Sequence, residues 1–193
     1  LSGTWHKQGI PYVILDSVTI SSTSTVTVPS GTIFKLAGSD YLYVQGVLNL
    51  QGTSGDPVYF TSLQDDTVGG DTNNDGVATS PESGDWGYVR IANSNNNVHD
   101  CVFRYGGYLS YTNYGALYIT GCSPTVADNT FVQNRRGIFI DDGSPALLRN
   151  SIQNSTYAPV LLSDSSFPTY SDNSYLNNAR QAVELDGVVA LSG

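Results

Sequence analysis

From residue 115 onward, the chain repeats one short pattern of apolar and polar positions. Four segments begin at residues 115, 137, 159 and 182, so they are spaced by 22, 22 and 23 residues. Each segment opens with alternating residues, in which the paired apolar positions are Leu117 and Ile119, Ile138 and Ile140, Val160 and Leu162, and Val183 and Leu185. Successive side chains of a strand point to opposite faces, so we expect the intervening residues on the other face. These are Tyr118, Phe139, Leu161 and Glu184.

A second motif recurs later in each segment, as DNTF, RNSI and DNSY. Its asparagines are Asn129, Asn150 and Asn173, and each stands two residues before a large apolar side chain. The stretch DCVF at 100–103 fits the same frame, with Cys101 at the asparagine position. Asparagine tolerates the left-handed backbone conformation and bonds to nearby backbone groups, so we expect a sharp bend here. Stacked asparagines can also hydrogen-bond to one another along the column.

A period of about 22 residues, with short strands and a recurring bend, is typical of a solenoid. Leucine-rich repeats share this length, but their Leu/Asn consensus is missing from the sequence. The pattern therefore predicts an all-β fold, a right-handed, single-stranded parallel β-helix with one turn per repeat. We expect residues 1–193 to form a single domain of this kind.

Alternating apolar residues at 17–50, 57–62 and 86–92 predict further turns in the first half of the chain. Two insertions interrupt the pattern, at 64–85 and 106–114, and they leave neighbouring turns. Insertions in a solenoid usually gather on one face and often carry the function.

The composition agrees with strands and turns, and it excludes several classes of partner. Charged residues make up only 13%, with 8 Lys and Arg against 20 Gly and 13 Tyr. A net charge of −9 and a pI of about 4.3 would repel the phosphates of nucleic acids and an anionic membrane surface. No apolar run is long enough to cross a membrane, and no signal peptide is visible. Because the chain starts at Leu1, we expect a mature product or a segment of a longer protein.

The stretch DTNNDGVATSPE at 71–82 has the spacing of an EF-hand calcium loop, without the flanking helices. The predicted ligands are the side chains of Asp71, Asn73, Asp75 and Glu82 and the carbonyl group of Val77. Candidates to replace a missing ligand are Asp65, Asp66 and Asp85. Seven of the 17 acidic residues lie between 56 and 85 with no Lys or Arg among them, so Ca²⁺ would relieve their repulsion. A solvated acidic loop is the alternative, and Pro81 weakens the match at the closing glutamate.

Six stretches in the first half resemble a family of secreted bacterial β-helix proteins, in the broad pectate-lyase-like superfold. They are IPYVI, VTVPSGTIFKL, LYVQGVLNLQGT, PVYFTSLQDD, GGDTNNDG and GDWGYV, and they cover most of residues 10–90. The resemblance implies an extracellular or cell-surface protein, usually large and modular, and it implies no particular activity. Lyases, hydrolases, adhesins and inert spacers share the superfold, so the fold alone does not settle the function.

The two ends of the sequence share the letters LSG. Joining ELDGVVALSG to LSGTWHKQG through these letters produces an uninterrupted sequence in the style of this family. One interpretation is a unit of a tandem array, or a subunit that stacks end to end through the exposed strand edges of its terminal turns. A chance match of three residues is the other interpretation.

We recognise no catalytic constellation, so we expect no enzyme. Arg90 and Arg104 follow the acidic loop, where a lyase would need a base, but we expect them to be outward-facing surface residues. Asp141 and Asp142 stand at a strand end, but the His and basic motifs that accompany such a pair in β-helix glycosidases are missing. The two cysteines, Cys101 and Cys122, are expected to be thiols packed as small apolar groups.

The second insertion, YGGYLSYTNYG, contains regularly spaced tyrosines at Tyr105, Tyr108, Tyr111 and Tyr114. Tyrosine rings suit sugars and protein partners, or they fold back over the outward column of Tyr88, Tyr118, Phe139 and Leu161. We expect an extracellular structural or adhesive module that is stabilised by Ca²⁺ and self-associates or joins neighbouring repeats. A carbohydrate-binding or lyase-like module is the alternative.

Overall fold

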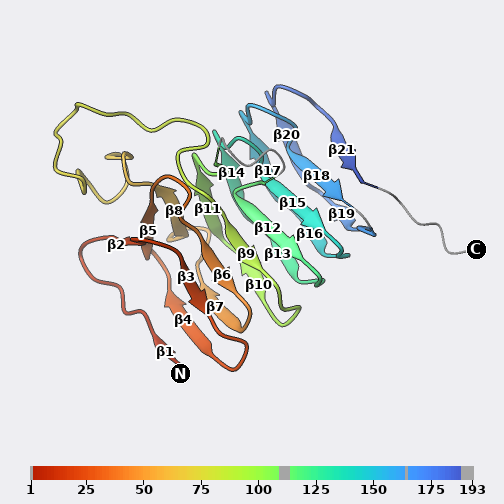
Figure 1. Ribbon diagram of the computed structural model, residues 1–193, viewed down its shortest axis with the longest axis horizontal. Coiled ribbons are helices and arrows are strands. Elements are labelled where there is room, and N and C mark those ends of the chain that lie inside the picture. Colours follow the sequence, from red (N-terminus) through yellow and green to blue (C-terminus); the bar gives the residue numbers. More distant parts are fainter. Residues whose placement is uncertain (1, 109–113, 164, 188–193) are drawn as a thin grey trace, which may run out of the picture.

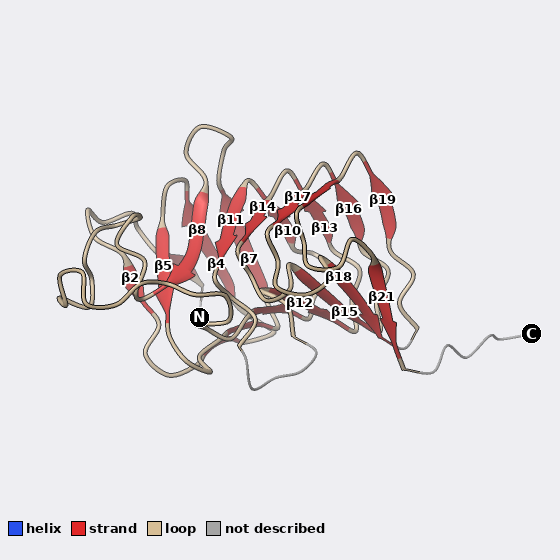
Figure 2. Ribbon diagram, turned by 90° about the horizontal axis from the view of Figure 1, so that it is seen from above, coloured by secondary structure: helices blue, strands red, loops and turns tan. Residues whose placement is uncertain are grey.

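The computed structural model describes residues 2–108, 114–163 and 165–187. Within these residues the chain contains strands and turns and no helix, so no helix is long and apolar enough to cross a bilayer. The strands of successive turns lie side by side along the long axis of the molecule (Figure 1), and they form the separate sides of a solenoid (Figure 2). Every pairing between these strands is parallel.

Each turn contributes one strand to each of three sides. The first side, sheet 1, contains β2 (Tyr12–Val13), β5 (Ile33–Leu36), β8 (Val58–Ser62), β11 (Cys101–Arg104), β14 (Thr130–Val132), β17 (Ser151–Gln153) and β20 (Ser174–Leu176). Sheet 2 contains β3 (Val18–Ile20), β6 (Leu42–Val44), β9 (Val89–Ile91), β12 (Leu117–Thr120), β15 (Ile138–Asp141), β18 (Val160–Ser163) and β21 (Val183–Asp186). The third side contains β1 (Gly3–Thr4), β4 (Thr25–Pro29) and β7 (Val47–Gln51), and then β10 (Asn97–His99), β13 (Thr125–Ala127), β16 (Ala146–Leu148) and β19 (Thr169–Ser171).

The register of sheet 2 confirms the repeat that the apolar pattern predicts. Leu117 pairs with Ile138, Ile138 with Val160, and Val160 with Val183. This column of side chains is buried inside the solenoid from Leu117 as far as Val160. The predicted all-β parallel solenoid is therefore confirmed, with about 23 residues per turn.

Aromatic rings stack through the interior behind sheet 1. Phe34, Phe60, Phe103 and Phe131 come from four successive turns, and their ring centroids are 5.1, 5.1 and 4.8 Å apart. All four are buried, and the rings are nearly parallel. In-register strands place identical residues one above another, so the stack follows from the repeat itself.

The predicted asparagine column is present at the bend before sheet 1. The Nδ2 group of Asn129 donates to Oδ1 of Asn150 at 3.0 Å, and Nδ2 of Asn150 donates to Oδ1 of Asn173 at 3.0 Å. At the top of the column, the backbone N–H of Cys101 donates to Asn129 Oδ1 at 3.0 Å. The left-handed conformation falls one residue earlier than expected, with φ angles of 59° at Asp128, 52° at Arg149 and 56° at Asp172. The asparagine side chains therefore hold the bend from its neighbouring position.

A second bend, after sheet 1, is also held by asparagine side chains, which the sequence analysis did not predict. Asn134 Oδ1 accepts the N–H of Gly106 at 2.8 Å, and its Nδ2 donates to the carbonyl of Phe103 at 2.9 Å. Asn178 makes the matching bonds to the N–H of Ser155 and the carbonyl of Ile152, both at 3.0 Å. The signal was present as VQN and LNN after β14 and β20, but the serine in the middle turn interrupts it.

Both insertions leave sheet 1 and return in sheet 2, so they lie at the same corner of neighbouring turns. The first runs between β8 and β9 and forms the long yellow loop in Figure 1, and the second runs between β11 and β12. The fully buried Trp86 joins them, because it forms a parallel bridge to Gly106 and its Nε1 donates to the Arg104 carbonyl at 2.6 Å. The two insertions thus share one anchor.

Candidate metal centre

Three carboxylates converge in the first insertion. One oxygen from each of Asp66, Asp71 and Asp75 lies within 4.8 Å of the others. Asp71 and Asp75 belong to the predicted EF-hand-like set, and Asp66 belongs to the predicted replacements. Hard divalent cations such as Ca²⁺ prefer several carboxylate and amide oxygens of this kind.

Three buried oxygens of the same insertion have no hydrogen-bond donor. Oδ1 of Asp66, Oδ1 of Asn73 and Oδ1 of Asp75 are inaccessible to solvent and have no hydrogen-bond partner among the described residues. Most buried polar atoms in proteins are hydrogen-bonded, and each one left without a partner is costly. A bound cation is one partner that would relieve this cost, so the donor types fit an oxygen-ligated metal.

Backbone and side-chain bonds within the loop hold these groups in place. Asp71 accepts the backbone N–H groups of Asp75 at 3.1 Å and of Gly76 at 2.9 Å. Asn73 Nδ2 donates to Asp75 Oδ2 at 2.7 Å, and the hydroxyl of Thr79 donates to the same oxygen. Gly76 has a φ of 71°, which suits the tight turn. These bonds hold the loop in shape without a helix on either side.

Two other predicted ligands, Glu82 and Asp85, lie outside this carboxylate group. The backbone N–H of Glu82 donates to Oδ2 of Asp85 at 2.9 Å. That Asp85 oxygen also accepts the Ser62 hydroxyl at 2.8 Å, and burial raises the pKa of Asp85. Glu82 and Asp85 thus close the base of the insertion, and neither joins the three-carboxylate group found among the described residues.

Asp65 has protein partners in place of a metal. It is fully buried, accepts the hydroxyls of Thr61 at 2.6 Å and Thr67 at 2.5 Å, and pairs with Arg104 Nη1 at 3.3 Å. Arg104 comes from β11 on the next turn, so this pair attaches the insertion to the solenoid. The adjacent residues Asp65 and Asp66 therefore point to different partners.

Lys35, on β5, also contacts the acidic loop. It is fully buried and its Nζ donates to the carbonyl of Gly70 at 2.6 Å. Burial lowers the pKa of Lys35, and the charges of Asp65, Asp66 and Asp71 oppose this change. Lys35 offsets part of the negative charge of the insertion, and it fixes the backbone just before Asp71.

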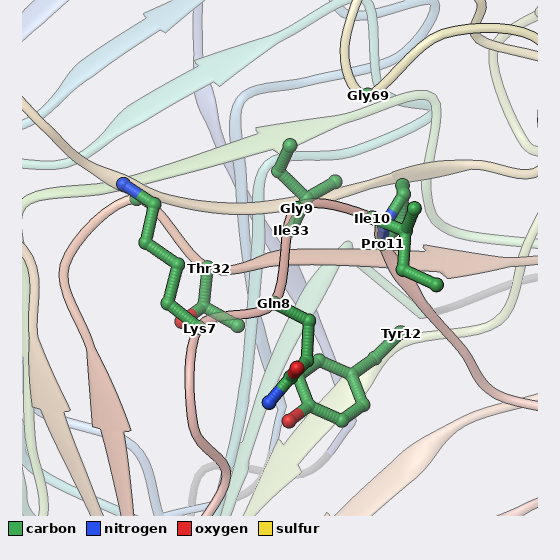
Figure 3. A pocket seen from close by; sticks show the side chains of 10 residues that line it. Lys7, Gln8, Gly9, Ile10, Pro11, Tyr12, Thr32, Ile33 and Gly69 are labelled. Atoms are coloured by element: carbon green, nitrogen blue, oxygen red, sulfur yellow. The ribbon is translucent and has the colours of Figure 1, made fainter.

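A small hollow of about 130 Å³ lies beside this insertion (Figure 3). Residues 7–12 and 31–33 line it together with Gly69. Gly69 has a φ of 74°, and a Cβ atom there would come within 2.4 Å of Pro11 Cγ. The carboxylates of the metal cluster do not line this hollow. It marks where the insertion packs against the N-terminal turn.

The tyrosines of the second insertion take part in packing. Tyr105 is buried, accepts a bond from Arg104 Nη2 at 2.8 Å and donates to Gln133 Oε1 at 3.3 Å. Tyr114 lies on the outward face of sheet 2, with its ring 4.9 Å from that of Tyr88 and 5.0 Å from that of Tyr118. The backbone carbonyl of Tyr108 accepts Nη1 of Arg135 at 3.2 Å. The remaining predicted residue, Tyr111, lies outside the described residues.

Residues weighed for catalysis have other partners. Asp141 accepts the Tyr118 hydroxyl at 2.8 Å, and burial together with this bond raises the pKa of Tyr118 to about 12. Arg90 stacks between the rings of Tyr43 and Tyr118, at 4.6 and 4.8 Å. Both cysteines, Cys101 and Cys122, are free and buried. Burial raises the pKa of both thiols, which keeps them protonated and unreactive.

Comparison with known proteins gives a family and no close relative. No curated protein and no solved structure matches the chain. The model of the family described as "Right handed beta helix region" matches residues 82–189, which is more than half of the chain. The matched region contains the repeated turns and the asparagine column described above. The chain therefore belongs to the right-handed β-helix family.

Proposed function

We propose that this protein is an extracellular structural module, a stiff β-helix whose acidic insertion is ordered by Ca²⁺. The observation that carries the metal part is the set of three buried oxygens without donors, in Asp66, Asn73 and Asp75. Asp66 and Asp75 also belong to the group of three converging carboxylates. Continuous ladders of asparagine and phenylalanine along the solenoid support the structural part. A weak site suits the extracellular medium, where modules of this kind bind Ca²⁺ with Kd on the order of 10⁻⁴ to 10⁻³ M.

Calcium binding is tested best with Asp66→Asn. This change removes one carboxylate charge but keeps the size of the side chain, so the fold is retained. We expect calorimetric titration to show one Ca²⁺ site in the parent protein and an affinity about tenfold lower in the variant, because a hard cation loses a charged ligand. Hydrogen exchange of residues 66–79 should slow on adding Ca²⁺, since the bound ion closes the loop.

The matched control is Asp16→Asn. Asp16 is exposed, lies outside the cluster and has a φ of 57°, which asparagine tolerates. Calcium binding should be unchanged in this variant. Absence of a saturable Ca²⁺ signal in the parent protein, or equal weakening in both variants, would rule out the proposed site.

We also propose that the modules associate end to end. All three sides of the solenoid begin with the strands of the first turn and end with β19, β20 and β21, whose outer edges carry no further strand among the described residues. Apolar side chains are exposed on this last turn, with Leu185 73% and Leu176 55% exposed. Unpaired parallel edges with apolar residues favour the addition of another chain.

Molecular mass measured by light scattering tests this association. We expect the mass to rise with protein concentration in Ca²⁺, and Leu185→Lys to lower it towards that of the monomer. Asn95→Lys is the control, because it adds the same charge at an exposed position of a middle turn, between β9 and β10. A monomer at every concentration would contradict end-to-end association and would leave the calcium proposal standing. Glycan binding through the tyrosine insertion gains no support, because Tyr105 and Tyr114 contribute to packing.

A further inference from the structure

Three arginines surround one tyrosine at the corner between sheet 1 and sheet 2. The guanidinium carbons of Arg135, Arg136 and Arg180 lie 4.8, 5.2 and 5.7 Å from the ring centre of Tyr157. Together with Tyr157, these three arginines form the arginine cluster. The chain has only 8 Lys and Arg residues and a net charge of −9, so three of its cations at one corner form a marked local excess of positive charge.

The repeat itself assembles this cluster. In sheet 2, Ile138 pairs with Val160 and Val160 pairs with Val183. Each of these residues follows a cluster residue by three positions, so Arg135, Tyr157 and Arg180 occupy the same place in three successive turns. The N–H of Tyr157 donates to the Arg135 carbonyl at 2.9 Å, which fixes the alignment of the first two. Residues that lie 22 and 23 positions apart thus stack as one column.

One carboxylate balances part of this charge. Glu184, on β21, accepts hydrogen bonds from Arg136 and from Arg180. Burial opposes ionisation, but these two guanidinium groups hold the pKa of Glu184 below its ordinary value. These two ion pairs attach β21 to the preceding turns. They also show that Arg136 and Arg180 together can bind an anionic oxygen group.

The ion pairs with Glu184 do not satisfy every donor of the arginine cluster. Arg136 is 6% exposed, and its Nε is buried with no hydrogen-bond partner among the described residues. Next to it lies an open hollow of about 340 Å³, which Arg136 and Arg180 line together with Leu161, Glu184, Leu185 and Asp186. Two arginines and two carboxylates, Glu184 and Asp186, line this hollow, and Arg135 adds a further positive charge beside Tyr157 at the same corner. Planar guanidinium groups bind tetrahedral oxyanions through paired N–H donors.

We propose that the arginine cluster binds a small tetrahedral oxyanion, a phosphate or sulfate group, which replaces the Glu184 carboxylate between Arg136 and Arg180. The same group is presented by a free inorganic ion or by an ester on a sugar. This site is independent of the metal centre, which lies in an insertion from an earlier turn.

Binding can be followed by NMR of the arginine Nε–H groups and the Tyr157 ring during titration with inorganic phosphate, inorganic sulfate and glucose 6-phosphate, with chloride keeping the ionic strength constant. We expect saturable shifts at the cluster. Arg180→Gln should weaken binding about tenfold, because one charged donor is lost, and Glu184→Gln should strengthen it, because the competing carboxylate is neutralised.

Arg149→Gln is the matched control. Its side chain is 53% exposed, close to the 61% of Arg180, and it pairs with Asp128 away from the cluster. Saturable binding that survives Arg149→Gln but not Arg180→Gln supports the site, and the sugar phosphate then shows whether an ester-linked group is accepted as well as the free ion. No saturable shift, or the same affinity in both arginine variants, would overturn the proposal.

Discussion

Replacing Arg104 with leucine is expected to lower the free energy of unfolding by about 3–5 kcal/mol, because the change leaves a buried carboxylate without its cation. That carboxylate belongs to Asp65, which is fully buried and lies 3.3 Å from Arg104 Nη1. Arg104 also donates to the Tyr105 hydroxyl at 2.8 Å, so both insertions lose an anchor. Urea unfolding followed by circular dichroism measures the change.

The control for this variant is Arg149→Leu. Arg149 also pairs with an aspartate, Asp128, at 2.7 Å, but both side chains are well exposed. Ion pairs at the surface contribute about 0–1 kcal/mol, so this variant should stay close to the parent protein. A second check is Arg104→Leu combined with Asp65→Leu, which removes both charges and should recover part of the stability. Equal losses in the two arginine variants would show that the Asp65 pair does not anchor the insertion.

Asn150→Ala is expected to cost about 3–5 kcal/mol, because several buried groups lose their partners at about 1–3 kcal/mol each. Asn150 Oδ1 accepts the backbone N–H of Asn129 at 3.1 Å and its side-chain Nδ2 at 3.0 Å. Asn150 Nδ2 donates to the carbonyl of Val126 at 2.8 Å and to Asn173 Oδ1 at 3.0 Å. Chemical unfolding of the variant reports the loss.

Asn150→Asp sharpens this test. Aspartate keeps the acceptor for Asn129 but places a charged oxygen towards the Val126 carbonyl, so it should be nearly as damaging as alanine. Asn49→Ala is the control, because Asn49 is exposed and makes one long bond of 3.5 Å to Thr27. A loss below about 1 kcal/mol for Asn150→Ala would mean that the column follows the fold and does not stabilise it.

The strands and their register could be predicted from the sequence, for a physical reason. Side chains of a strand alternate with a period of two, so a shift of one residue would move Leu117 and Ile119 from the interior to the outside. Only one register buries the apolar residues of every turn, and the alternating pattern specifies it. The asparagine column follows from the same register, since residues one repeat apart stack directly. The positions of both insertions follow from the breaks in this period.

The composition of the candidate sites depended on tertiary structure. The EF-hand spacing placed Glu82 in the predicted ligand set. In an EF-hand the flanking helices orient that glutamate, and this chain has no helix there. The backbone N–H of Glu82 instead donates to the Asp85 carboxylate. Asp66 joins Asp71 and Asp75 because the chain folds back between them, which no local motif encodes.

The arginine cluster shows the same division most clearly. The repeat places Arg135, Tyr157 and Arg180 in one column, but only the tertiary structure brings Arg136 and Glu184 to them. The sequence by itself determined the repeat, the register and the columns, because alternation and period act on every residue of a turn. Only the tertiary structure decided which side chains from different turns and loops meet, because a long side chain or an insertion can reach across the corner to several neighbours. Burial and charge then select among those neighbours.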